Sequence, residues 1–101
     1  MSATSIYNYE TVAAGQTTQT LGATGGKGDY LSRVIIVPAT TSPGVVTVID
    51  GSTTVIAFAG GASSLTELKP ITVEVGTVSV NGAWKITTGT NVSVMAIGDF
   101  L

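Results

Sequence analysis

The pattern closest to a nucleotide-binding motif is a glycine-rich segment at residues 22–28 (GATGGKG). A phosphate-binding loop has four residues between its first glycine and the Gly-Lys pair, and a Ser or Thr follows to reach magnesium. Here three residues separate Gly22 from Gly26-Lys27, and Gly28 stands where the hydroxyl should be. The next segment, DYLSRVIIV, has the pattern of a strand, whereas phosphate binding uses the N-terminus of a helix. We therefore interpret this segment as a connecting loop.

Acid–base catalysis and metal binding would have to rest on few side chains, because the chain has no His and no Cys. It therefore lacks the commonest general base and any thiolate. The carboxylates are Glu10, Asp29, Asp50, Glu67, Glu74 and Asp99. No Asp-x-Asp or Glu-x-x-His spacing links them, and Asp50 is explained by a hairpin turn with Gly51. We expect no catalytic residue, no metal ligand and no cofactor. If the protein is an enzyme, the remaining possibility is a hydrolase with a Ser nucleophile and a Lys base.

The aromatic residues offer a binding surface for a sugar or for a partner protein. Tyr7 and Tyr9 lie two residues apart, so their rings share one face if this segment is a strand. The alternative is that both rings cover the edge of the core. Trp84 alternates with Ile86 in the way that inward-facing residues do, and we place Trp84 in the core.

The composition excludes several classes of function. The chain has 101 residues, of which 10% are charged and 44% are hydrophobic, and its formal net charge is -2. Its 4 Lys and Arg residues cannot form the basic surface that nucleic-acid binding needs. The longest apolar run covers residues 34–39, whereas a membrane-spanning helix needs about 20 apolar residues. The first residues also lack the pattern of a secretory signal. We therefore expect neither a nucleic-acid partner nor a membrane.

The residues that position any site belong to an all-β fold. The chain contains 17 Thr, 13 Val and 8 Ile, and these β-branched side chains favour strands. Residues 71–75 (ITVEV) and 84–88 (WKITT) alternate with a period of two, and Asn81-Gly82 predicts a two-residue hairpin turn. The predicted strands cover residues 5–13, 17–21, 30–37, 45–50, 53–59, 70–75, 77–80, 83–88 and 91–98.

This arrangement predicts a single β domain over residues 1–101, with residues 1–10 as a candidate amino-terminal arm. The expected architecture is a two-sheet antiparallel sandwich or jelly roll of about eight short strands, and a small barrel is the alternative. The side chains that we expect to face the core are Val34, Ile36, Val46, Val48, Ile56, Phe58, Ile71, Val73, Val75, Trp84, Ile86, Val92 and Val94.

The shortage of charge points to contacts with other subunits. Sheet edges are usually protected by Lys, Pro or bulges, yet the predicted strands VVTVI, TTVIAFA and VSVMAIG carry no charge. Either these strands all lie inside sheets, or another subunit covers the exposed ones. We favour the second interpretation; the alternative is a monomer kept soluble by its many hydroxyl groups.

Residues 44–61 (GVVTVIDGSTTVIAFAGG) and 80–100 (VNGAWKITTGTNVSVMAIGDF) resemble small β-rich structural proteins of tailed-bacteriophage virions, most of all capsid decoration (cement) proteins. Short Val/Thr strands, Asn-Gly and Thr-Gly turns and a C-terminal strand of small residues carry the resemblance. It implies a non-enzymatic protein, often a homotrimer, that is made in the host cytoplasm and binds the major capsid protein on the capsid surface. Such a protein stabilises the capsid by bridging its subunits.

For this function we predict an interface that includes Ile6, Tyr7, Tyr9, Tyr30, Phe100 and Leu101. The alternative function is a carbohydrate- or host-binding β-module of a phage tail or fibre. In that case Tyr7, Tyr9 and Trp84 are the expected contacts.

Overall fold

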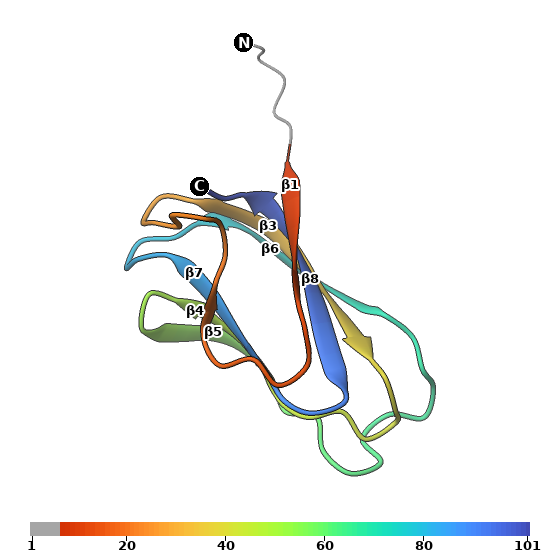
Figure 1. Ribbon diagram of the computed structural model, residues 1–101. Coiled ribbons are helices and arrows are strands. Elements are labelled where there is room, and N and C mark those ends of the chain that lie inside the picture. Colours follow the sequence, from red (N-terminus) through yellow and green to blue (C-terminus); the bar gives the residue numbers. More distant parts are fainter. Residues whose placement is uncertain (1–6) are drawn as a thin grey trace.

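The described part of the chain folds into eight β-strands, which confirms the predicted all-β class (Figure 1). A computed structural model describes residues 7–101. The strands are β1 (Asn8–Val12), β2 (Gln19–Thr20), β3 (Tyr30–Pro38), β4 (Val46–Asp50), β5 (Thr53–Phe58), β6 (Ile71–Val78), β7 (Trp84–Thr88) and β8 (Val92–Asp99). Among the described residues, no helix is long and apolar enough to cross a membrane. Of the arm expected at residues 1–10, residues 8–10 belong to β1, and residues 1–6 lie outside the described part.

Two four-stranded antiparallel sheets form a sandwich: sheet A has the order β1-β8-β3-β6, and sheet B has the order β2-β7-β4-β5. Strand β1 pairs with β8, β2 with β7, β3 with β6, and β4 with β5, as in one long hairpin. When successive pairs of such a hairpin alternate between two layers, the result is the jelly-roll order. In Figure 1 the chain turns back after β1 and runs into β2, which places sheet B opposite sheet A.

Strand β6 differs from the prediction of two strands separated at Gly76. The strand continues through Gly76, whose φ is +65°. Strand β3 advances by two residues from Leu31 to Arg33, while the paired β6 moves by three from Thr77 to Glu74. The extra residue forms a bulge, and glycine adopts its positive φ without a side-chain clash. The strand therefore stays paired where the sequence suggested a break.

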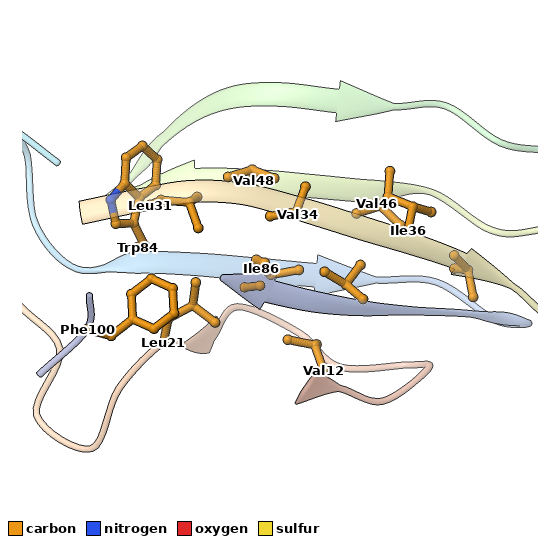
Figure 2. Close-up of a cluster of buried hydrophobic side chains, with 13 residues drawn as sticks. Val12, Leu21, Leu31, Val34, Ile36, Val46, Val48, Trp84, Ile86 and Phe100 are labelled. Carbon is orange, nitrogen blue, oxygen red and sulfur yellow. The ribbon is translucent and has the colours of Figure 1, made fainter. Parts of the chain in front are cut away.

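The core lies between the two sheets and contains every residue that the alternation placed inward. Those on β3, β4, β7 and β8 are buried, whereas those on β5 and β6 are half-buried and pack against them. The buried core also includes residues beyond the predicted set, namely Val12, Leu21, Leu31, Ala96 and Phe100. Figure 2 shows Trp84, Leu31, Leu21 and Phe100 together at one end of this core.

Two of the three uncharged strands are internal. Strand β4 lies between β5 and β7, and strand β8 lies between β1 and β3. The third uncharged strand, β5, is an edge strand. Its register with β4 shifts between Val48 and Ile49, where Val55 is the extra residue. A bulge at an edge discourages pairing with a further strand. The edges of β4 and β8 are therefore covered within their own sheets, and among these three strands only β5 has an edge that another subunit could cover.

Candidate functional site

The glycine-rich segment 22–28 is a connecting loop in which the main-chain N–H groups of Gly22, Thr24, Gly26 and Gly28 have acceptors within the protein. Gly26 N–H donates to Asp29 Oδ2 at 3.1 Å, and Gly28 N–H donates to Ser79 Oγ at 3.0 Å. The buried Ser79 hydroxyl in turn donates to the Gly26 carbonyl oxygen at 3.3 Å. A phosphate-binding loop needs such N–H groups for its ligand. Their use by the protein's own oxygens supports the interpretation as a connection.

Asp29 links this loop to the carboxyl end of the chain and to the core. Its Oδ2 accepts the Leu101 N–H at 3.3 Å, and its main-chain oxygen accepts the Trp84 Nε1–H at 2.9 Å. Thr24 holds the same end, because its N–H and its hydroxyl both donate to the Leu101 oxygen at 3.0 Å. The Asp29 carboxylate therefore joins the loop to the carboxyl end of the chain, while the main-chain oxygen of Asp29 holds the Trp84 ring.

Two further carboxylates accept main-chain N–H groups. Glu10 Oε1 accepts the Gly22 N–H at 2.7 Å and ties β1 to the start of the loop. Asp50 is 5% exposed, and its two oxygens accept the N–H groups of Val80 and Asn81, each at 3.0 Å. The hairpin turn explained only the position of Asp50; its carboxylate joins the β4–β5 turn to the segment between β6 and β7.

The remaining carboxylates, Glu67, Glu74 and Asp99, are exposed. Glu67 Oε2 lies 2.9 Å from Lys69 Nζ in the segment between β5 and β6. Within residues 7–101, no three potential metal ligands gather into a site, and no pocket is found. Glu74 and Asp99 both lie on the surface of sheet A that faces away from the core.

That surface, the outer face of sheet A, is largely apolar. Because side chains alternate along a strand, the neighbours of the buried core residues point outward. The apolar side chains on this face are Tyr7, Tyr9, Tyr30, Ile35, Val37, Val78, Met95 and Ile97, each exposed or half-buried. The solvent side of an antiparallel sheet is usually polar. The outer face of sheet A departs from that rule over several strands.

The strand register places these side chains in adjacent rows. Tyr9 is opposite Ile97, and Ile97 is opposite Arg33. In the next row, Met95 is opposite Ile35. Strands β8 and β3 therefore share a contiguous apolar strip, with tyrosines beside it.

Tyr7 and Tyr30 form an aromatic contact at one end of the outer face. Their ring centroids lie 5.4 Å apart, and the ring planes are inclined by 40°. Hydrogen bonding with Tyr30 raises the pKa of Tyr7 above its ordinary value of 10.0. Tyr9, two residues along β1, is 69% exposed. The three rings form an aromatic group to which a partner or a sugar has access.

Three charged side chains and the hydroxyl side chains of Thr11, Thr72 and Ser93 interrupt this apolar surface. Arg33 is half-buried and lies opposite Glu74 in the register, and Asp99 lies on the adjacent strand β8. Among the described residues, the one ion pair with a nitrogen–oxygen distance of 4.0 Å or less joins Lys69 and Glu67. Arg33, Glu74 and Asp99 therefore have no such ion pair within the described part of the chain.

The outer face of sheet B follows the usual polar pattern. Its outward side chains include Thr20, Thr47, Ile49, Thr54, Ala57, Lys85 and Thr87. Ile49 is the large apolar side chain in this set, and it lies opposite Lys85. The two outer faces of the sandwich therefore differ in chemistry, although their strands have similar compositions.

A second uncovered apolar region lies along the edge strands β5 and β6, and we call it the open side. Gln19 on β2 donates to Glu10 on β1 at 2.7 Å, so β1 and β2 end their sheets on one side and β5 and β6 end them on the other. The open side comprises the half-buried Ile56, Phe58, Ile71, Val73 and Val75 and the exposed Val55. Core side chains therefore remain partly uncovered along this side.

The residues predicted for an interface have different positions. Tyr7, Tyr9 and Tyr30 lie together on the outer face of sheet A. Phe100 is 5% exposed and lies in the core, so its side chain is not part of the surface. Leu101 is exposed at the carboxyl end, where its main chain is held, and Ile6 lies outside the described residues. Trp84 is 1% exposed, as expected for a core residue, and it makes no surface contact with a sugar.

Sequence reasoning missed the aliphatic part of the outer face, namely Ile35, Val37, Met95 and Ile97. A signal was present in residues 34–37 (VIIV) and 94–97 (VMAI), where apolar residues occupy both faces of one strand. Continuous apolar runs of this kind are typical of strands covered on both sides.

No family model, no curated protein and no solved structure matches this chain. Its function is therefore inferred from the chemistry of its own surfaces and from the resemblance in residues 44–61 and 80–100.

Proposed function

We propose that this chain is a non-enzymatic structural protein of a tailed-phage virion, where it decorates the capsid and stabilises it by bridging capsid subunits. The outer face of sheet A carries this proposal, because its aromatic and aliphatic side chains lie where a solvent-facing sheet usually has polar ones. Contiguous exposed apolar surfaces mark contact sites. The resemblance to decoration proteins supplies the kind of assembly.

A bridging protein needs more than one contact surface, and the open side is the second candidate. Its five half-buried core residues gain further burial if a neighbour covers them. The proposed neighbours are other copies of this chain and the major capsid protein on the capsid exterior. Each contact is modest, and several contacts per copy add through multivalency. The resemblance implies a homotrimer as the building block.

The proposal is tested on virus particles from a culture that produces this chain. We expect mass spectrometry of gradient-purified particles to find the chain in a fixed ratio to the major capsid protein. Ile97→Asp, on the outer face of sheet A, should abolish binding to particles stripped of the chain, whereas Ile49→Asp, on the outer face of sheet B, should leave binding unchanged. Absence of the chain from particles, or equal binding by the two variants, would contradict the proposal.

The second candidate function is a carbohydrate- or host-binding module, and the exposed tyrosines favour it. Tyr9 is 69% exposed and Tyr7 is 47% exposed, and a sugar can stack on an exposed aromatic ring. We expect such a module to retain glycans on an array, and Tyr9→Ala to abolish the signal without changing the fold. An array without any retained glycan would remove this candidate and leave the structural proposal in place.

A further inference from the structure

We propose that the outer face of sheet A binds a second copy of this chain, related by a two-fold axis that runs parallel to the strands. This inference deepens the proposed function and rests on it only in treating the outer face of sheet A as a contact surface. It assigns the occupant of that face and the symmetry of the contact. The open side is left for other partners.

The size of the face suits a contact between two sheets. Strand β3 has 9 residues, and sheet A has four strands. With a rise of about 3.4 Å per residue and about 4.8 Å between strands, the face covers roughly 500 Å² in projection. Its accessible area is larger, because side chains corrugate the surface, and stable interfaces bury about 800 Å² on each partner. A second sheet of the same size is therefore a fitting occupant.

The charges on the face favour a copy of the same chain. Arg33 is a cation, while Glu74 and Asp99 are anions, and none of them has an ion pair within residues 7–101. A partner with a patch of one sign would neutralise one kind of charge and repel the other. A second copy supplies both signs, so each cation can meet an anion across the contact.

The register decides how the two copies lie. A two-fold axis parallel to the strands places β8 of one copy over β3 of the other and keeps the rows aligned. Ile97 then lies over Arg33 of the second copy, because the two are opposite in the register. Asp99 is two residues from Ile97 on the same face, about 7 Å along the strand. The facing sheets of the two copies lie about 10 Å apart, so the long Arg33 side chain of the second copy can reach Asp99. An axis across the strands instead places Arg33 over the row of Ile35 and Met95, where there is no anion.

Contact between identical faces is isologous and closes as a pair. A trimer, which the resemblance implies, needs two different surfaces on each copy. The outer face of sheet A therefore predicts a dimer, and the capsid protein or a glycan on this face would be a competing occupant.

The test compares charge variants by sedimentation equilibrium of the full chain from about 1 μM to 1 mM, a range that resolves weak dimers. Arg33→Asp and Asp99→Arg each place like charges together, so each should weaken the dimer at least about 10-fold. The double variant exchanges the two charges and should restore the affinity to within about 3-fold of the wild type. Lys85→Asp reverses a matched cation on the outer face of sheet B and should have no effect. Thermal melts confirm that each variant is folded.

A dimer that follows this pattern supports the inference. A monomer at the highest concentration, a trimer, or a dimer that the double variant does not restore would overturn it. The proposed function is tested separately on particles: a monomer or trimer that binds capsids would remove only the two-fold contact. A dimer that follows the charge pattern but is absent from particles would remove only the virion role.

Discussion

Replacing Asp50 with Ala should strongly destabilise the fold, although we assign this carboxylate no catalytic role. Asp50 is 5% exposed, and its oxygens accept the N–H groups of Val80 and Asn81 at 3.0 Å each. Asp50→Ala removes both acceptors and releases the segment between β6 and β7. Asp50→Asn keeps the shape and one acceptor oxygen but turns an NH2 donor toward the other N–H group, so its effect should be at least about half as large.

The magnitude follows from the number of bonds and from the exposure of the donors. A hydrogen bond to a charged acceptor contributes about 1.5–3 kcal/mol. Val80 and Asn81 are exposed, so water can replace part of the loss. We therefore take the lower value of this range for each of the two hydrogen bonds and expect the free energy of unfolding to decrease by about 3 kcal/mol. In a domain of this size, that corresponds to a decrease in Tm of about 12–24 °C.

Urea unfolding followed by the fluorescence of Trp84 measures this decrease. Trp84 is the single tryptophan, it is buried, and it lies opposite Asp50 in the register. Glu67→Ala is the matched control, because it removes an exposed carboxylate whose ion pair with Lys69 is worth less than about 1 kcal/mol. If Asp50→Ala and Glu67→Ala have equal free energies of unfolding, the Asp50 carboxylate does not hold the segment between β6 and β7, and the reasoning is refuted.

Three further outcomes are expected. Gly98→Ala should lower the free energy of unfolding by about 2 kcal/mol, because the new Cβ would meet the Tyr30 carbonyl oxygen. A Cβ at Gly26 would meet nothing within 4 Å, so Gly26→Ala should change the free energy of unfolding by less than about 0.5 kcal/mol; urea unfolding measures both. The raised pKa of Tyr7 favours the neutral phenol in the folded state, so this contribution to stability is present below pH 10.0 and is lost as pH rises through the raised pKa. Absorbance at 295 nm should show a tyrosine with a pKa above 10.0, and this titration step should be missing in Tyr7→Phe. Because the chain has no His and no Cys, Tm should be nearly constant between about pH 6 and 9, and a steep change in a pH series would contradict this.

Much of the fold could be predicted from the sequence because alternation and turn residues act locally. Every core residue predicted from a period of two lies in the core or packs against it. Gly76 was misinterpreted because glycine is common both in turns and in bulges, and only pairing with β3 distinguishes the two. The strand order depends on long-range pairing, such as β1 with β8, which no local pattern encodes.

The candidate contact surface was only partly predictable for a related reason. Tyr7 and Tyr9 were found from their spacing, but Tyr30 joins them through the fold. The sequence placed the uncovered regions at strand edges, because missing charge suggests an unprotected edge. In the structure, β8 is internal, and its outward residues Met95 and Ile97 instead make a face of the sheet apolar.

The central claim is that the chain works through the outer face of sheet A as a component of a larger particle. Electron cryomicroscopy of purified particles that contain the chain tests this most directly. We predict an eight-stranded density on the capsid exterior, with the outer face of sheet A covered by protein and the Thr-rich outer face of sheet B open to solvent. Particles in which sheet A faces solvent, or which lack this density altogether, would contradict the claim.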